Sequence, residues 1–486
     1  MSGYRQGDSG LILNEPLLWE KGKKGRCGFS LPTCDVDEVA FDEALMGDGP
    51  DFPDLSEVEV VRHYTRLSTW NFGVDTGLYP LGSCTMKYNP KTNERQAALP
   101  GFAGAHPLLP DERNQGALKL MYDLEQFLAR ITGMDAVTLQ PAAGAHGELA
   151  GVLMIHAYHQ KNGETRTKML IPDTAHGTNP ASCALCGYEP VAVPVGEDGI
   201  MRVEDIEALM DEETAGIMVT NPNTLGLFET NIQEICDIVH KRGGLVYGDG
   251  ANLNAIMGHV KMADLGVDVM HFNLHKTFST PHGGGGPGSG PVAVNKTLEP
   301  FLPVPRVEKE NDQYRLVSNR PDTIGRMMTF YGHFGVMVRA YSYILSMGEE
   351  GLKTASEHAV LNANYIKERL KETYEIAFDH TCMHECVFSD AKQQEYGVTT
   401  LDIAKRLIDY GFHPPTIYFP LVVPGAIMIE PTETETKEDI DNFVDTLVAI
   451  SKEAKTDADL LKNAPMRSKV RRLDETSAAR KPCLCG

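Results

Sequence analysis

Between residues 111 and 296, short apolar runs alternate with stretches of helical periodicity. The runs are rich in Val, Ile and Leu, as buried strands are. They lie at Ala136–Gln140, Lys168–Pro172, Pro190–Val195, Gly216–Thr220, Gly244–Gly248, Val267–Asn273 and Pro291–Asn295. In residues 231–242 and 202–211, between such runs, apolar side chains recur at helical spacing. The pattern predicts an α/β fold whose large, mixed but mostly parallel seven-stranded sheet is covered by helices on both faces.

The segments on either side of this region have different patterns. Residues 1–110 are rich in Pro, Gly and short polar interruptions, and they predict an extended arm with one helix at Val58–Ser68. Such an arm often docks on a partner subunit, and a plain N-terminal tail is the alternative. Asn319–Leu352 is predicted to be a long helix that leads into the last part of the chain.

The last part of the chain predicts a smaller α/β domain. Strand-like segments at Cys386–Ser389 and Ala426–Glu430 combine there with helical ones at Leu401–Tyr410 and Lys437–Ala454. The tail 464–486 is polar and predicted to be irregular. Because 486 residues exceed the usual size of a single core, we predict an N-terminal segment 1–110, a large domain 111–320 and a small C-terminal domain 321–486.

Charge and composition narrow the class of protein. The net charge of −22 argues against nucleic acid or an anionic membrane surface as the main partner. No apolar stretch reaches the roughly 18 residues of a membrane span, and the N-terminal MSGYRQGDSG lacks the pattern of a secretory signal. Ten irregularly spaced cysteines in such a chain predict reduced thiols and a cytoplasmic location.

A loop of small residues follows the first predicted strand. The segment Gln140–Glu148 reads QPAAGAHGE and opens a helix predicted to extend to about His159. Small residues at Ala143, Gly144 and Ala145 leave backbone N–H groups uncovered at the start of this helix, where a phosphate is favoured. A plain strand-to-helix turn explains the same residues equally well.

An acidic residue ends another apolar strand. Asp249 lies in LVYGDGAN, between two glycines, where core packing explains an acid poorly. A carboxylate beneath a pyridine ring would hold the ring nitrogen protonated by pairing with the cation. The alternative is a helix N-cap, since Asp is a favoured capping residue.

A lysine follows the next predicted strand. Lys276 lies in NLHKTFSTPHGGGG, just before a run of glycines. Most lysines are solvated surface charges, but an amine at a strand end inside an α/β crevice can lose its proton and attack an aldehyde. Gly283–Gly286 and Gly288 would let the backbone approach a cofactor or a neighbouring subunit. Their GxGxxG spacing precedes a strand and no helix, which excludes the dinucleotide-binding interpretation.

Two further groups of polar residues have competing interpretations. His176, in PDTAHGTNPAS, could stack on a flat ring, and the start of a capped helix is the simpler explanation of its neighbours. His380, Cys382, His384 and Cys386 alternate and would share one face of a strand. No second pair of ligands stands at zinc-site spacing, so no metal is expected.

Several long runs of the sequence together resemble one enzyme family. The runs are HYTRLSTWNFGVDTGLYPLGSCTMKYNPK (63–91), QPAAGAHGELAG (140–151), DTAHGTNPAS (173–182), TNPNTLGLFE (220–229), YGDGANLNA (247–255), NLHKTF (273–278), PDTIGRMMTFYGHFG (321–335) and EPTETET (430–436). In these runs the chain is similar to the subunits of glycine decarboxylase that carry pyridoxal 5′-phosphate (PLP), the P-proteins of the glycine cleavage system, in their two-subunit prokaryotic form. Its length suits subunit 2, which retains the lysine, and the KPCLCG end lies outside the pattern.

The resemblance implies a fold and a set of residue roles. The fold would be PLP-dependent transferase fold type I, which is aspartate-aminotransferase-like. Lys276 would hold PLP as a Schiff base, Asp249 would pair with the pyridine nitrogen, and His176 would stack on the ring. The loop at Ala143, Gly144 and Ala145 would receive the phosphate. Asn252 and His275 are expected at the periphery of the cofactor, whereas His63 and the segment Tyr79–Cys84 are expected near the path of the substrate.

The resemblance also implies a reaction and partners. Glycine would lose its carboxylate as CO2, and its aminomethyl group would pass to the lipoyl arm of the H-protein. The other partner would be glycine decarboxylase subunit 1, in a hetero-oligomer with two copies of each subunit. The strand-end residues alone leave two alternatives open: another fold type I PLP enzyme, such as an amino-acid decarboxylase or a glycine-using aldolase, or a non-catalytic assembly subunit.

Overall fold

A computed structural model describes residues 14–37, 39–106, 109–283 and 288–484 of the chain. Val74–Ala464 forms one compact unit, and the described residues before Val74 and after Ala464 form a second. The predicted division at residues 110 and 320 follows neither boundary and stays a prediction.

A seven-stranded sheet forms the centre of the larger unit, as predicted. Its strands are β1(Ala136–Thr138), β2(Lys168–Pro172), β3(Glu189–Val193), β4(Thr214–Thr220), β5(Leu245–Gly250), β6(Val269–Phe272) and β7(Val292–Val294). The order across the sheet is β1-β7-β6-β5-β4-β2-β3. β7 is antiparallel to both of its neighbours, whereas the other pairs are parallel. The carboxyl ends of β1, β2, β4, β5 and β6 therefore meet at one edge of the sheet.

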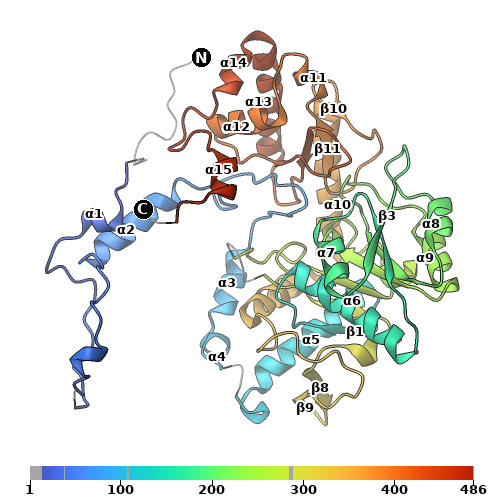
Figure 1. The fold of residues 1–486 in the computed structure, drawn as a ribbon, viewed down its shortest axis with the longest axis horizontal. Coiled ribbons are helices and arrows are strands. Elements are labelled where there is room, and N and C mark those ends of the chain that lie inside the picture. Colours follow the sequence, from blue (N-terminus) through green and yellow to red (C-terminus); the bar gives the residue numbers. More distant parts are fainter. Residues whose placement is uncertain (1–13, 38, 107–108, 284–287, 485–486) are drawn as a thin grey trace. The chain divides into compact units, whose positions relative to one another are not determined.

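Helices cover both faces of this sheet. They are α5(Gln115–Thr132), α6(Gly144–Lys161), α7(Thr178–Leu185), α8(Val203–Leu209) and α9(Ile232–Lys241). Successive side chains of a strand point to opposite faces, so Leu245 and Tyr247 pack with α6 and α7, whereas Val246 packs with α5, α8 and α9. The apolar face predicted for residues 231–242 is the buried face of α9, and α9 lies beside α8 (Figure 1).

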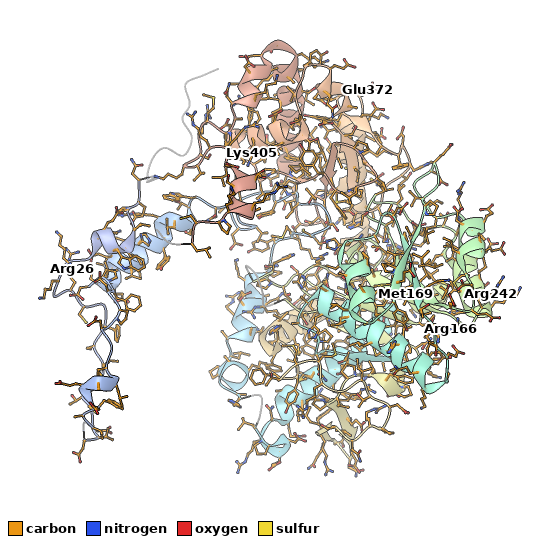
Figure 2. All side chains as sticks on the ribbon, viewed as in Figure 1. Arg26, Arg166, Met169, Arg242, Glu372 and Lys405 are labelled. Atoms are coloured by element: carbon orange, nitrogen blue, oxygen red, sulfur yellow. The ribbon has the colours of Figure 1, made fainter. Side chains whose placement is uncertain are left out.

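At the amino-terminal edge of the sheet, Arg166 forms hydrogen bonds to main-chain carbonyl groups. Arg166 donates from Nη1 to the carbonyl oxygens of Thr214 and Arg242, at 2.8 and 3.1 Å. Figure 2 shows Arg166 and Arg242 close to Met169, which is fully buried in β2. These contacts lie where β2, β4 and β5 begin. They do not involve the polar residues at the opposite edge of the sheet, where Asp249 and Lys276 lie.

A smaller antiparallel sheet follows, and it contains both of the strands that were predicted for the C-terminal part. Its strands β10(Glu375–Ile376), β11(Cys386–Ser389), β12(Thr416–Ile417) and β13(Ala426–Ile429) have the order β10-β11-β13-β12. Figure 1 shows α12(Thr400–Tyr410), α13(Lys437–Thr456) and α14(Ala458–Lys462) grouped beside it. The remaining elements of the unit are α3(Lys91–Ala97), α4(Pro100–Ala103), α11(Ala391–Gln394), β8(Arg306–Glu310), β9(Gln313–Val317), η2(Asp111–Arg113), η3(Leu253–Ala255), η4(Met262–Leu265) and η5(Glu299–Phe301).

The long helix predicted at Asn319–Leu352 is wrong in both of its limits. The helix is α10(Phe334–Leu370), and Gly348 interrupts it with φ of 61°. Pro321 disfavours a helix at the residue before it, and Gly325 and Gly332 adopt φ of 92° and 108°, which interrupt any helix before Phe334. The helix continues past Leu352 because small and apolar residues keep a helical spacing and become buried. These residues are Ala355, Ala359, Ala363, Ile366 and Leu370.

The second unit contains the arm and the tail. Its helices are α1(Leu18–Lys21), α2(Glu57–Ser68), α15(Glu475–Arg480) and the 3₁₀ turn η1(Glu43–Leu45). The helix predicted at Val58–Ser68 is confirmed by α2, whereas α15 shows that the tail is not wholly irregular. Among the described residues of both units, no helix combines the length and the apolar character that crossing a bilayer requires.

Glu125, a buried acid on α5, predicts a pH-dependent stability. Burial raises its pKa from 4.5 to about 8, partly offset by the charge of Arg306. The folded state thus binds this proton more tightly than the unfolded state. The contribution of the Glu125 proton to stability is fully present below pH 4.5 and is lost as the pH rises through 8. We expect Glu125→Gln to remove this loss, worth a few kcal/mol in order of magnitude. Thermal unfolding at pH 5 and pH 9 should show a gain in Tm for the variant mainly at the higher pH.

The control for this experiment is Glu112→Gln, which changes an exposed acid just before the same helix. It should shift Tm little at either pH. Equal Tm changes for Glu125→Gln at both pH values would contradict the assigned protonation.

Candidate active site

Asp249 is buried near the end of β5 and is held by contacts from three segments. Its Oδ1 accepts a hydrogen bond from the backbone N–H of Ala251 at 2.9 Å, and its Oδ2 accepts one from Asn179 Nδ2 at 3.3 Å. On the neighbouring strand, His271 pairs with Asp249 in register and places Nε2 3.5 Å from Oδ1. The carboxylate therefore has one fixed orientation at the carboxyl edge of the sheet.

His271 is in turn held by Tyr247, which lies on the same strand as Asp249. The Tyr247 hydroxyl is 2.6 Å from His271 Nδ1. Complete burial lowers the pKa of His271, although the charge of Asp249 opposes this. A neutral imidazole that accepts a hydrogen bond from the Tyr247 hydroxyl at Nδ1 carries its proton on Nε2, and this N–H faces Asp249. The contacts from Tyr247 to His271 and from His271 to Asp249 thus help to hold the carboxylate of Asp249 in place.

Lys276 lies in the turn that follows β6, next to β5. Its Nζ donates a hydrogen bond to the carbonyl oxygen of Ser83 at 2.8 Å. The charges of Lys276 and Asp249 both affect the pKa values of Glu148, His176 and His271. Lys276 and Asp249 therefore lie near the same three groups at the carboxyl edge of the sheet, and their roles stay predictions.

The predicted phosphate loop lies against the segment that carries Lys276. Helix α6 begins at Gly144, and its first N–H groups point out of the helix without intrahelical acceptors. A Cβ on Gly144 would come within 3.0 Å of Asn273 Oδ1, and a Cβ on Gly290 would lie 2.1 Å from the carbonyl oxygen of Ala143. Gly144 thus leaves little room for a side chain, whereas Ala145 is exposed. Binding of a phosphate by Ala143, Gly144 and Ala145 stays a prediction.

His176 follows β2 at the same edge. Its Nδ1 is 2.9 Å from Thr178 Oγ1, and its ring lies edge-on to Phe419 with centroids 5.8 Å apart. The residue is exposed, so a face of the ring is available for stacking. Thr178, at the start of α7, also donates to Glu148 Oε1 at 2.8 Å and so joins His176 to α6.

Asn252 and His275, the two residues predicted at the periphery, have different environments. Asn252 is buried and donates from Nδ2 to the carbonyl oxygen of Pro222 at 2.9 Å. His275 accepts a hydrogen bond at Nδ1 from the backbone N–H of Ser289 at 3.2 Å. Burial lowers the pKa of His275 to about 3, so its ring is neutral at physiological pH. Roles for both residues stay predictions.

Glu148 is a buried acid of this site to which the sequence argument gave no role. Burial, followed by the negative charge of Asp249, raises its pKa to about 8. At neutral pH the group is therefore mainly protonated and adds little negative charge beside Lys276.

His384, Glu385 and Glu430 form a second buried group beside Lys276. Glu385 Oε2 accepts from the backbone N–H of Ser83 at 2.7 Å, and Glu430 accepts from Thr85 N and Oγ1 at 2.8 and 2.6 Å. His384 Nε2 is 3.9 Å from both carboxylates. Burial raises the pKa of both acids, and the nearby charge of Glu430 raises that of Glu385 further.

Several buried polar atoms around Lys276 have no hydrogen-bond partner within the part of the chain that the structure describes. Such atoms are costly unless a ligand or water satisfies them. They are Asn252 Oδ1, Asn273 Oδ1, Thr277 Oγ1, Ser289 Oγ and Glu148 Oε2. A polar ligand at this edge of the sheet would supply the missing partners.

The alternating His/Cys residues are dispersed in the structure. His380 is exposed, whereas Cys382 and Cys386 pack in the core beneath the small sheet. His384 points its ligand atom toward Glu385 and Glu430 instead. Of the predicted glycine run, Gly284–Gly286 lie outside the described residues, as does Cys485 of the tail. Gly288 is described, and a Cβ there would lie 2.7 Å from His275 Nδ1.

The two segments expected near the path of the substrate fall in different units. His63 belongs to the smaller unit, where its Nδ1 is 2.9 Å from Glu15 Oε1. Tyr79 belongs to the larger unit and stacks on His413 with centroids 3.8 Å apart. Cys84 lies near Lys276, although burial raises the pKa of its thiol. Only the end of the Tyr79–Cys84 segment thus reaches the site.

Sequence reasoning missed the acids and the carbonyl that surround Lys276. Glu148 stands four positions after Gly144, so the helical period alone could have placed it on the face of α6 that meets the sheet. Glu430 directly follows β13 and carries the same strand-end signal as Asp249. Ser83 and Glu385 offer no local signal, because they reach Lys276 from distant parts of the chain.

Comparisons with known proteins agree with this geometry. Residues 355–468 match the family described as glycine dehydrogenase, C-terminal domain, and residues 147–303 match aminotransferase class-V. The chain is 58% identical over 475 residues to a probable glycine dehydrogenase (decarboxylating) subunit 2 of Listeria innocua, covering 96% of this chain and 97% of the relative. A relative of the same name from Caldanaerobacter subterraneus is 58% identical over 474 residues, with 96% and 98% covered.

Solved structures show the same fold. A crystal structure of glycine decarboxylase (P-protein) of the glycine cleavage system superposes with a TM-score of 0.71 at 19% identity, covering 84% of this chain and 93% of that one. Glutamate decarboxylase of Lactobacillus brevis superposes with a TM-score of 0.65 at 14% identity, with 88% and 96% covered. The predicted α/β transferase fold is therefore confirmed.

Proposed function

The chain belongs to the glycine dehydrogenase (decarboxylating) subunit 2 family, and we propose that it decarboxylates glycine at the site around Lys276 and Asp249. The observation that carries the proposal is the convergence of a lysine and a buried acid at the carboxyl edge of adjacent parallel strands. Ligands of open α/β sheets bind at this edge. The substrate is inferred from the family, and the residues that act on it are inferred from the geometry of the site.

The site fits PLP, the cofactor of enzymes with this fold. Lys276 would hold its aldehyde carbon, Asp249 its ring nitrogen and the N–H groups at the start of α6 its phosphate. The unpartnered buried atoms of Asn252, Asn273 and Ser289 offer further polar contacts. When bound, PLP supplies an electron sink for the electron pair that the departing carboxylate leaves behind.

The residues around Lys276 and Asp249 prepare them for these tasks. An amine must be neutral to act as a nucleophile, and nearby negative charge opposes the loss of its proton. The pKa of Glu148 is raised to about 8, and the pKa values of Glu385 and Glu430 are raised as well, which favours the uncharged forms and limits that negative charge. Ser83 O holds the Lys276 amine through a hydrogen bond, whereas Asn179 and Ala251 orient the carboxylate of Asp249.

The name of the family implies a second kind of subunit. We propose that the acceptor of the aminomethyl group is the lipoyl disulfide of the H-protein, and that two copies of each subunit assemble. The carboxylate of glycine leaves as CO2, and the remaining carbon bonds to one sulfur while the S–S bond breaks. The other sulfur is released as a thiol, with its proton taken from the ammonium of the substrate. A cytoplasmic location stays part of this proposal.

Exchange of the glycine carboxyl with labelled bicarbonate tests the proposed activity. The purified chain with PLP, subunit 1 and lipoylated H-protein should incorporate label into glycine. Omitting the carrier or subunit 1 should lower the exchange by at least about tenfold, because each supplies a partner of the proposed reaction. H-protein that lacks lipoate is the matched control.

Other outcomes would identify the alternatives. Carrier-independent CO2 release from another amino acid would indicate a different PLP decarboxylase. Cleavage of a β-hydroxy amino acid to glycine would indicate an aldolase. A colourless protein that binds subunit 1 but no PLP would indicate a non-catalytic assembly subunit.

A further inference from the structure

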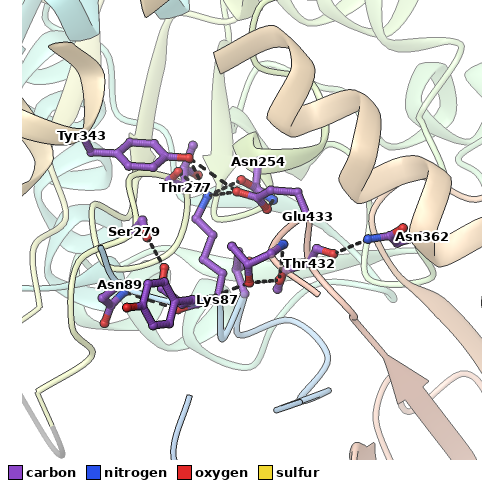
Figure 3. A network of polar contacts seen from close by, with 12 residues as sticks. Lys87, Asn89, Asn254, Thr277, Ser279, Tyr343, Asn362, Thr432 and Glu433 are labelled. Carbon is purple, nitrogen blue, oxygen red and sulfur yellow. Dashed lines mark hydrogen bonds and ion pairs between the residues drawn. The ribbon is translucent and has the colours of Figure 1, made fainter. Parts of the chain in front are cut away.

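Lys87 is a buried cation that the proposed reaction does not use. Its side chain is 0% exposed and its Nζ has four neighbours: Glu433 Oε1 at 2.6 Å, Thr277 O at 2.8 Å, Asn254 Oδ1 at 2.9 Å and the Tyr343 hydroxyl at 3.4 Å. Figure 3 shows these side chains converging on the ammonium group from separate parts of the chain. A buried ammonium is costly unless such partners compensate for lost hydration.

The segment that carries Lys87 lies along the turn that carries Lys276. Ser83 O accepts from Lys276 Nζ, Cys84 O is 2.9 Å from His282 Nε2, and Tyr88 O accepts from Ser279 Oγ at 2.6 Å. The bond from Lys87 to Thr277 O reaches the main-chain carbonyl of the residue directly after Lys276. Residues 83–88 thus contact residues 276–282 at four points, and the Lys87 contact brings a buried side-chain charge to the main chain of the turn.

The same ammonium also reaches the loop that follows Asp249. Asn254 lies in η3, shortly after Asp249, and its Nδ2 donates to Glu433 Oε2 at 3.2 Å while its Oδ1 accepts from Lys87. Glu433 comes from the segment after β13, and Tyr343 comes from α10. One side chain therefore links the main chain beside Lys276, the loop beside Asp249 and the C-terminal part of the chain.

We propose that Lys87 is a positioning residue of the active site, which holds the main chain of Lys276 and the loop after Asp249 in the relative placement that catalysis needs. This inference rests on the proposed function of Lys276. Misplacement of a reacting group by about 1 Å can slow a reaction by about a hundredfold. A charged three-donor group that binds both loops is suited to prevent such a shift.

A purely stabilising ion pair would give the same contacts, so the test must separate positioning from stability. Lys87→Met keeps an unbranched side chain that ends one atom before the ammonium nitrogen, and it leaves Glu433 without its cation. The double variant Lys87→Met/Glu433→Gln removes both charges, and the amide introduced at position 433 can still accept from Asn254. Replacing both members of a buried pair is often neutral for stability, whereas removing one is not.

Two quantities are measured: Tm without cofactor, and the rate at which added PLP becomes attached to Lys276. Borohydride reduction and peptide mapping follow the attachment over time. Lys87→Met should lose both Tm and attachment rate. The double variant should regain Tm but attach PLP at least about tenfold more slowly than the unmodified chain. The pH midpoint of the lysine-bound PLP absorbance should also shift. Lys91→Met is the matched control, because Lys91 forms an exposed pair with Asp75 near Lys87.

Each outcome decides the proposal. A double variant that regains both Tm and attachment rate would show that Lys87 only stabilises the fold. If the double variant does not fold, Glu433→Gln decides, because it keeps the Lys87 bonds to Thr277 and Asn254. Normal attachment by Glu433→Gln supports the proposal, and slow attachment overturns it. Labelling of a lysine other than Lys276 in the unmodified chain would instead refute the proposed function.

Discussion

Lys276→Ala is expected to abolish covalent attachment of PLP and to lower glycine–bicarbonate exchange by at least about a thousandfold. The reason is that no other described lysine joins Asp249 and His176 at the carboxyl edge of the sheet. The variant should fold, since the Lys276 side chain is only half-buried and makes one hydrogen bond to the residues that the structure describes, at Ser83 O. Absorbance of the lysine-bound cofactor and labelling with borohydride provide the measurements.

Two controls sharpen this experiment. Lys296→Ala changes an exposed lysine after β7 and should keep absorbance, labelling and exchange. Added methylamine should partly restore exchange to Lys276→Ala, because the missing side chain leaves room for a small primary amine. A Lys276→Ala protein that still forms a borohydride-reducible adduct at another lysine would contradict the assignment.

Asp249→Ala, and its isosteric counterpart Asp249→Asn, are expected to retain some PLP but to decarboxylate about 10² to 10⁴ times more slowly. A neutral side chain cannot pair with a protonated ring nitrogen, so the electron sink weakens. The Asp249→Asn variant could also present an amide nitrogen in place of the oxygen that faces His271 Nε2. Exchange kinetics and the amount of PLP fixed by borohydride separate loss of turnover from loss of cofactor.

The matched control is Asp264→Asn, an exposed acid on η4 whose charge change is the same. It should exchange label at the normal rate. Turnover of Asp249→Asn within about twofold of the unmodified chain would remove the role of Asp249 as the partner of the ring nitrogen, because an isosteric amide loses the charge and little else.

Those parts of the site that depend on neighbouring strands could be predicted from the sequence. Lys168–Pro172 and Cys386–Ser389 form strands with the predicted limits, because β-rich apolar runs bounded by breakers need only local information. Asp249 lies near the end of β5 and Lys276 follows the adjacent parallel strand β6, so the strand ends place both at the same edge of the sheet.

The surroundings of Lys276 could not be predicted in this way. Ser83 and Glu385 are 302 positions apart, and Lys87 and Thr277 are 190 positions apart, so no spacing in the sequence relates them. Their contacts arise when the segment before α3 and the segments beside the small sheet fold back onto the β6 turn. The misplaced start of α10 has a different cause, since a helical pattern was extended backward across Pro321.

The most direct test of the account is to locate the cofactor on the unmodified chain. The purified protein is mixed with PLP, reduced with borohydride and digested, and the peptide that carries the pyridoxyl group is sequenced by mass spectrometry. The account predicts a single labelled site at Lys276, lost when glycine is added before reduction because substrate displaces the lysine. A pyridoxyl group on any other lysine, or label at Lys276 that glycine does not affect, would contradict it.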